Sequence, residues 1–115
     1  MYPEVKPYIS KDGSEIRELM HPSVHGNHAQ SLAEATVPPG AKTLLHRHRA
    51  TEEIYCFTAG EGIMTLDSKT FPVRTGDTIA IAPGTAHCVE NTGGEPMKIL
   101  CACSPAYSHE DTELI

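Results

Sequence analysis

Apolar positions along the chain come in short segments of four to eight residues, separated by clusters of glycine, proline, aspartate and serine. These clusters recur at intervals of roughly 8 to 12 residues, a spacing typical of an all-β sandwich or barrel. No long amphipathic helical pattern occurs between Gly40 and Ser104, which excludes a parallel α/β architecture. The pattern predicts strands over residues 31–37, 43–48, 53–59, 63–66, 71–74, 78–82, 86–90 and 97–104.

The two ends of the chain are less regular. Residues 8–19 fit either a strand or a short helical turn, and the pattern leaves both open. The last residues are polar and acidic, so we expect a solvated tail, although Tyr107 and His109 have the reach to approach a pocket mouth. The expected organisation is a leading strand and loop segment (1–34), a barrel core (35–104) and a polar tail (105–115).

Histidines and a glutamate stand on the predicted strands at spacings that suit a metal. His46 and His48 are two residues apart, so both imidazoles leave the same face if the segment is extended. Glu53 begins the next strand, and His87 lies on a later one. Three imidazoles and one carboxylate from three strands form a natural ligand set for a divalent first-row transition metal.

The two blocks that carry these residues resemble the two motifs of the cupin family. The first motif, Gly-x5-His-x-His-x4-Glu-x6-Gly, is matched at every spacing by the block from Gly40 to Gly60. The second, Gly-x5-Pro-x-Gly-x2-His-x3-Asn, is matched by the block from Gly76 to Asn91, except that Ala82 replaces the first proline. Pro83 is adjacent, so we expect the turn to form there. The resemblance covers roughly residues 35 to 104.

What the resemblance implies is a small jelly-roll barrel, also called a double-stranded β-helix, in one domain. It implies one divalent metal ion per chain, held by His46, His48, Glu53 and His87, with Glu52 one place too early to be the ligand. The chain is similar in this to the small cupins that are likened to mannose-6-phosphate isomerases. Because single-domain cupins commonly pair, the resemblance also implies a homodimer.

Three neutral imidazoles and one carboxylate leave a divalent ion with a net charge of about +1, which attracts an anionic or polarisable oxygen ligand. An ion that prefers six ligands keeps positions open for substrate, so we expect a functional metal more than a structural one. The ion is iron, manganese, nickel, copper or zinc, and the sequence does not choose among them. Strand parity predicts mostly apolar side chains around it, from Leu44, Tyr55, Phe57, Ile79, Ile81 and Val89.

Charge and composition restrict the partners. The formal charge of −6 argues against nucleic acid and anionic membranes, because both need a basic face. The first residues lack the apolar core of a secretory signal, and no stretch approaches the ~20 apolar residues of a membrane span. We therefore expect a cytoplasmic protein with a small-molecule ligand.

Other cysteines and histidines have simpler interpretations. In a reducing compartment the four cysteines stay free. Cys101 and Cys103 fit a packed strand better than a zinc site, and parity turns Cys56 and Cys88 away from the metal. His21, His25 and His28 are interrupted by Pro22 and Gly26, which makes a loop more plausible than a second metal site.

Three functions are compatible with this site. A redox-active ion beside dioxygen and an enolate, carboxylate or thiol substrate would make a dioxygenase. An ion acting as a Lewis acid would serve an isomerase, epimerase or lyase. The third is a non-enzymatic binding or sensor domain, against which the lack of an attached DNA-binding segment counts. The sequence identifies no general acid or base, and Glu52, Tyr107 and His109 are weak candidates.

Overall fold

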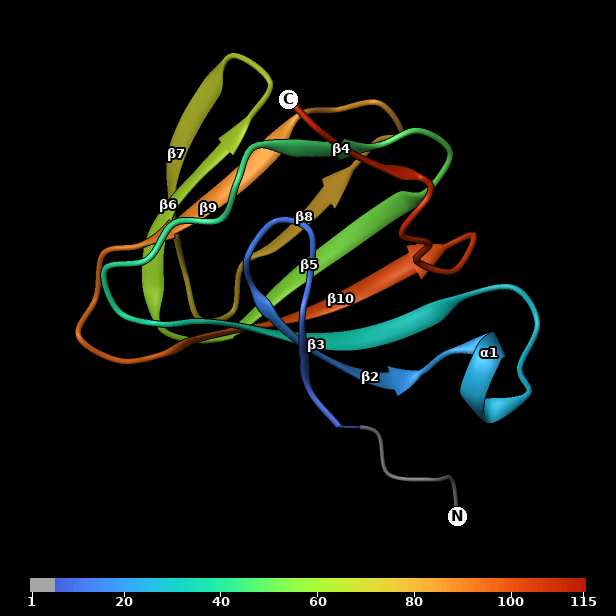
Figure 1. The fold of residues 1–115 in the computed structure, drawn as a ribbon. Coiled ribbons are helices and arrows are strands. Elements are labelled where there is room, and N and C mark those ends of the chain that lie inside the picture. The colour runs from blue at the N-terminus through green and yellow to red at the C-terminus, as the bar shows by residue number, and fades with distance from the viewer. Residues whose placement is uncertain (1–5) are drawn as a thin grey trace.

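The structure is a computed structural model that describes residues 6–115, in which two antiparallel sheets enclose a common interior (Figure 1). Residues 1–5, the start of the segment 1–34 that we expected to precede the barrel, lie outside the described part. One sheet has six strands, in the order β1 (Tyr8–Ile9), β2 (Glu15–Met20), β3 (Ser31–Val37), β10 (Met97–Ser104), β5 (Glu52–Ala59) and β8 (Thr78–Ile81). The other has five, in the order β11 (Thr112–Leu114), β4 (His46–His48), β9 (His87–Asn91), β6 (Glu61–Leu66) and β7 (Lys69–Arg74).

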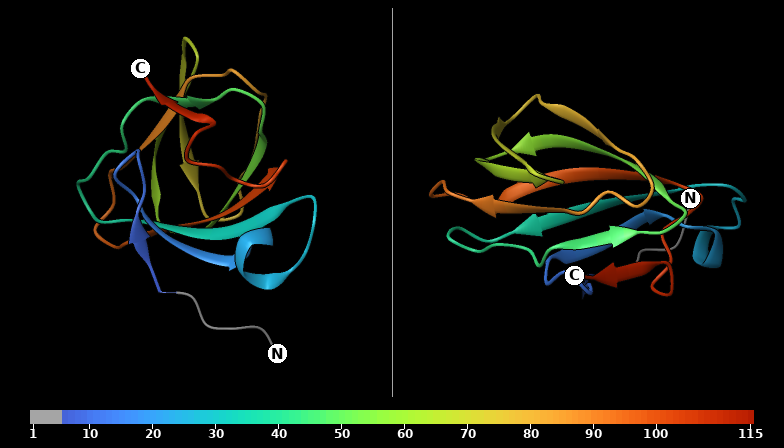
Figure 2. Two further views of the ribbon diagram at one scale, coloured as in Figure 1. Left: turned by 45° about the vertical axis from the view of Figure 1, so that its right-hand side comes forward. Right: turned by 90° about the horizontal axis from the view of Figure 1, so that it is seen from above.

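The strands curve around the interior, so that the molecule is a small barrel when viewed from its end (Figure 2). Side chains alternate between core and solvent along β3 and β10, as a sheet with one buried face requires. The largest fully buried apolar side chains belong to Phe57, Met64, Ile81, Met97 and Ile99. Each of these contributes roughly 1.5–3 kcal/mol by leaving water. The prediction of an all-β jelly-roll domain is confirmed.

Most predicted strands agree with the structure to within two residues at each end. The exception is residues 43–48, where only His46–His48 is a strand. Just before it, Leu44 donates its backbone N–H to the carbonyl of Asp12 at 2.7 Å. This bond draws the chain out of the sheet, and the Leu44 side chain is 53% exposed instead of facing the interior.

The N-terminal segment, which the sequence left undecided between strand and helix, forms the β1–β2 hairpin. The turn of this hairpin, residues 10–14, lies over the end of the barrel that carries His46. After β2 the chain makes the short helix α1 (Pro22–His25), whose N-cap is His21. Residues 6–115 contain no helix that is long and apolar enough to cross a membrane.

The C-terminal segment differs from the solvated tail that we expected. Thr112–Leu114 forms β11 and pairs with β4, so that Thr112 lies opposite His48 and Leu114 opposite His46. The Asp111 carboxylate accepts hydrogen bonds from the N–H groups of Ala50 and Thr51, which holds this segment against the turn after β4. Thr112 is buried as a result.

The turn between β8 and β9 forms as predicted despite Ala82. The N–H of Thr85 bonds to the carbonyl of Ala82 at 3.1 Å, and Gly84 adopts a φ of 83°. Glycine is favoured there because other residues rarely adopt this left-handed conformation. The Gly84 N–H also donates to the carbonyl of His48 at 2.7 Å. The turn therefore connects the strand that carries His48 to the strand that carries His87, which is another predicted ligand.

Candidate metal centre

Three imidazoles meet inside the barrel. His46 and His48 come from β4, and His87 lies directly opposite His46 on β9. All three are buried, and one ligand nitrogen from each lies within 4.8 Å of the others. The ring centroids of His46 and His87 are 4.2 Å apart. Within the described residues this is the one group of three or more such ligands that could hold a metal, and the histidines around α1 do not form another.

Hydrogen bonds on the outer side of the rings decide which nitrogen faces the centre. His46 Nδ1 lies 2.8 Å from the carbonyl oxygen of Leu44, and His87 Nδ1 lies 2.9 Å from that of Thr85. A carbonyl only accepts, so Nδ1 carries the hydrogen in both rings. Burial lowers the pKa of His46, and the neighbouring His87 lowers it further, which favours the neutral ring. Each Nε2 therefore presents a lone pair to the interior.

His48 is oriented in the same way by a residue of β11. Its Nδ1 lies 2.9 Å from the Thr112 hydroxyl, which donates its own hydrogen to the carbonyl of Ser108 at 3.0 Å. The hydroxyl therefore accepts from Nδ1–H, and His48 too directs a lone pair from Nε2 inward. Sequence reasoning missed Thr112, because it lies far from the histidine in the chain and belongs to no spacing motif.

Glu53, the fourth predicted ligand, lies beside two of the histidines and is not part of the group of three. Its Oε1 lies 3.1 Å from His48 Nε2 and 3.4 Å from His87 Nε2. Its Oε2 accepts a hydrogen bond from the Cys103 thiol at 3.3 Å. Burial raises the pKa of Glu53, but the hydrogen bonds and charge that His48 and His87 offer when protonated outweigh burial and lower it to about 2. Glu52, by contrast, is exposed.

These residues fit a divalent metal ion. When the rings are neutral, their Nε2 atoms are hydrogen-bond acceptors, and they lie close to one another and to the Glu53 carboxylate. Glu53 Oε1 and His87 Nε2 are buried without a hydrogen-bond partner among the described residues. Buried acceptors of this kind are stabilised by a cation between them. Nitrogen and oxygen donors in this combination suit a first-row transition metal, and which metal binds is left open.

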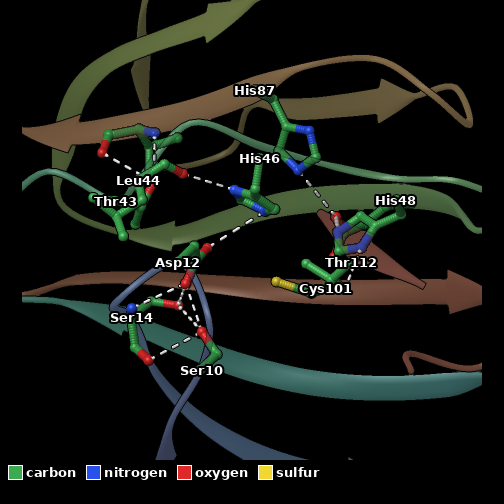
Figure 3. Close-up of polar contacts among 12 residues, drawn as sticks. Ser10, Asp12, Ser14, Thr43, Leu44, His46, His48, His87, Cys101 and Thr112 are labelled. Atoms are coloured by element: carbon green, nitrogen blue, oxygen red, sulfur yellow. Dashed lines mark hydrogen bonds and ion pairs between the residues drawn. The ribbon is translucent and has the colours of Figure 1, made fainter. Parts of the chain in front are cut away.

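Asp12 is a further carboxylate at the centre, and the sequence did not single it out. Its Oδ2 lies 3.5 Å from His46 Nε2 (Figure 3). Its Oδ1 accepts hydrogen bonds from the Ser10 hydroxyl, from the Ser14 hydroxyl at 2.7 Å and from the Ser14 N–H at 3.0 Å. One oxygen is therefore fixed and the other is free to face the site. The available signal was the turn sequence around Gly13, whose polar residues carry no metal spacing.

A cavity opens next to the histidines. Its wall includes two of them, Glu53, Asp12 and residues of both termini. The full set of lining residues is Tyr8, Ser10, Asp12, Ser14, Ile16, Glu18, Ser31, Ala33, Ala35, His46, His48, Glu53, Tyr55, Cys101, Cys103, Tyr107 and Thr112. The wall thus carries carboxyl, imidazole and hydroxyl groups beside apolar side chains of the kind that strand parity predicted.

Of the six predicted lining residues, the cavity touches only Tyr55. Phe57, Ile81 and Val89 share the barrel interior but belong to the closed core, and Ile79 packs against that core. Leu44 is turned outward for the reason given above. Parity gives the face of a strand, but it does not distinguish the open end of a barrel from its filled end.

The residues that the sequence offered as weak acid or base candidates, and the cysteine pair, differ in whether they reach the cavity. Tyr107 lines the cavity, and its ring centroid lies 5.9 Å from that of His48. His109 and Glu52 are exposed. Cys101 and Cys103 are free and buried on a packed strand, and both also face the cavity.

Comparison with known proteins agrees with this site. The model of the cupin domain matches residues 33–103, so the chain belongs to the cupin family. An uncharacterised protein of Methanocaldococcus jannaschii is 58% identical over 99% of this chain and 91% of its own. An oxalate-binding protein of Thermotoga maritima is 33% identical over 75% of this chain and 71% of its own.

A solved structure from Thermotoga maritima, described as a predicted oxalate decarboxylase, superposes with a TM-score of 0.77. It is 28% identical and covers 91% of this chain and 98% of its own. Together with the three buried histidines, these similarities support a cupin that binds a metal.

Proposed function

We propose that this cupin is an enzyme that holds one divalent transition metal through His46, His48, His87 and Glu53 and acts on a small oxygen-bearing substrate. The observation that carries the proposal is the gathering of three buried imidazoles, two of which lie beside a buried Glu53 oxygen that has no hydrogen-bond partner among the described residues. A bound ion of net charge about +1 would supply a Lewis acid that polarises an oxygen atom of the substrate.

Asp12 favours a reaction that includes proton transfer. Its Oδ2 faces the ligand histidine His46, while three hydrogen bonds on Oδ1 hold the carboxylate in place. A carboxylate fixed beside a polarised substrate can accept a proton at Oδ2 and return it to another atom. This arrangement supports isomerase, epimerase or lyase chemistry with Asp12 as the base.

The dioxygenase and the binding domain stay as alternatives, and oxygen separates the first from the proposal. The same four ligands serve oxidative chemistry when the metal is redox-active, because the fold itself does not determine the reaction. Turnover that consumes dioxygen would favour the dioxygenase. Turnover without dioxygen, and retained with zinc, would support proton-transfer chemistry. Saturable binding with the ligand recovered unchanged would favour the binding domain.

The metal site is tested by elemental analysis of protein purified without added metal or chelator. We expect near-stoichiometric metal in the wild type and its loss in His87→Ala. Glu53→Gln should lower occupancy, whereas Glu52→Gln, the neighbouring matched control, should retain it. Full occupancy in His87→Ala, or loss in Glu52→Gln but not in Glu53→Gln, would contradict the ligand assignment.

Asp12→Asn then tests the role of the base. The amide has nearly the same shape but is a far weaker proton acceptor. With metal occupancy unchanged, we expect turnover to fall by roughly 100-fold or more, the usual contribution of a positioned base. Undiminished turnover would remove Asp12 from the mechanism.

We also infer that the protein forms a homodimer through the outer face of the six-stranded sheet. An apolar row crosses five paired strands there, formed by Met20, Leu32, Ala102, Ile54 and Ala80. Leu32 is 37% and Ile54 41% exposed. Arg17 and Glu34 lie beside the row and carry opposite charges. Two copies related by a two-fold axis would therefore not bring surfaces of one charge sign together, which would repel each other.

A further inference from the structure

The wall of the cavity also carries polar groups that the metal site does not use. Glu18 on β2 is buried, and its Oε1 accepts a hydrogen bond from the Tyr8 hydroxyl at 3.0 Å. Its Oε2 is buried without a partner among the described residues. The hydroxyl of Tyr107 is likewise buried without a hydrogen-bond partner in that part of the chain. Both side chains line the cavity.

Neighbouring groups leave these atoms unpaired. Thr112, which also lines the cavity, donates its hydroxyl hydrogen to Ser108 and accepts from His48, and although it lies near the Tyr107 phenol no hydrogen bond joins the two hydroxyls. Tyr107 is fixed through its backbone, since its N–H donates to the Ser31 hydroxyl. Buried polar atoms that are held in position without a partner destabilise the fold unless something else completes their hydrogen bonds. A bound small molecule in the cavity is the natural partner.

The charge of the wall indicates what that molecule is. Asp12, Glu18 and Glu53 bring three carboxyl groups, and none of the described lining residues is a lysine or an arginine. Lys11, next to Asp12, directs its Nζ to the carbonyls of His109 and Thr112 and does not line the cavity.

Burial raises the pKa of Glu18, and the nearby imidazoles of His21 and His25 oppose this effect. His21 accepts from the Ser23 N–H at Nδ1 and donates from Nε2 to the carbonyl of Tyr107, so both of its ring nitrogens are already engaged. A metal with Glu53 as ligand carries about one positive charge, which Asp12 offsets. The described wall of the cavity offers no lysine or arginine to a second anionic group of a substrate.

We propose that the cavity selects a small, uncharged molecule that bears hydroxyl groups, with Glu18 and Tyr107 as the residues that orient it, and that it discriminates against dicarboxylates such as oxalate. The inference rests on the proposed metal site, which binds an oxygen atom at the other end of the molecule. A hydroxyl group both donates and accepts, so it completes the hydrogen bonds of a carboxyl oxygen and of a phenol alike. The oxalate bound by the relative would bring two negative charges to this acidic wall.

Binding of two probes to the metal-loaded protein tests the inference, with dihydroxyacetone as the uncharged hydroxyl compound and oxalate as the dianion. By calorimetry we expect dihydroxyacetone to bind more tightly than oxalate. Tyr107→Phe should weaken dihydroxyacetone by about 2- to 10-fold, the effect of one lost hydrogen bond. Glu18→Gln keeps the shape and removes a potential negative charge, so it should tighten oxalate binding by at least a few-fold.

Glu15→Gln is the matched control, because Glu15 lies on the same strand but is exposed and outside the cavity. It should leave both affinities unchanged. Tighter binding of oxalate than of dihydroxyacetone, with no effect of Glu18→Gln or Tyr107→Phe, would overturn the inference. Elemental analysis of the same samples separates the two proposals, since absence of metal refutes the site itself, whereas a loaded protein with the wrong preference refutes only the selectivity.

Discussion

At the scale of single residues, the state of protonation determines whether the centre can bind an ion. Burial raises the pKa of Glu53, but His48 and His87 lower it to about 2 when they are protonated, so the carboxylate is charged whenever these rings are. The charge that Glu53 contributes to metal binding is present above this pKa and is lost only as the pH falls through about 2. An imidazole nitrogen binds a metal only when it is deprotonated, so protons compete with the ion at the three rings on mild acidification.

We expect metal affinity to fall as the pH decreases from 8 to 5, and Glu53→Gln to bind the metal more weakly throughout this range. Protons compete with the ion at the Nε2 atoms, and the variant lacks the negative charge of the carboxylate. Competition with a chromophoric chelator at several pH values measures both curves. Affinity that does not fall on acidification, or that is unchanged in Glu53→Gln, would contradict the assignment of these residues as ligands.

Residues of the site differ in how far the sequence could predict them. His46, His48, Glu53 and His87 stand at fixed spacings, and alternation along a strand alone places the first two on one face. The function of Asp12 depends on where a hairpin turn lies relative to a distant strand, which no local pattern records. Leu44 shows the converse, because one backbone bond to Asp12 overrides the parity that predicted an inward side chain.

At the scale of elements, β11 is part of the metal site and not an appendage. It pairs with β4 and places Thr112 opposite His48, and the Thr112 hydroxyl accepts a hydrogen bond from His48 Nδ1–H. A polar and acidic composition suggested a solvated tail, but three residues suffice for a strand when a partner edge is available. Long strands were predictable because their alternation repeats, whereas β11 is too short to show any period.

Thr112→Val should weaken metal binding by roughly 10- to 100-fold, because valine keeps the shape but cannot accept from His48 Nδ1. Thr112→Ser is the matched control and should bind the metal almost as the wild type does, since it keeps the hydroxyl. Chelator competition at pH 7.5 measures the affinities, and circular dichroism verifies that each variant is folded. Equal affinity in Thr112→Val and the wild type would show that β11 does not orient the ligand.

At the scale of the whole molecule, the two sheets present different outer surfaces. The six-stranded sheet carries the apolar row that we assign to a dimer, and it does so on its face away from the metal centre. The five-stranded sheet also has a partly exposed isoleucine, Ile63 on β6, but no comparable row is evident around it: its β7 neighbour is Pro72 and its β9 neighbour is the exposed Glu90. The chain therefore provides an internal comparison of two isoleucines on opposite sheets.

We expect the wild type to have twice the 12.4 kDa mass of one chain by light scattering, and Ile54→Lys to have the mass of one. A charge at the centre of an apolar interface has to be buried without a partner, which strongly disfavours association. Ile63→Lys introduces the same charge at a similar exposure, 37% against 41%, and should remain dimeric. A monomeric wild type would refute the dimer, while a dimer that survives Ile54→Lys and dissociates in Ile63→Lys would move the interface to the other sheet. Because the row lies outside the barrel, metal occupancy should be the same in all three proteins.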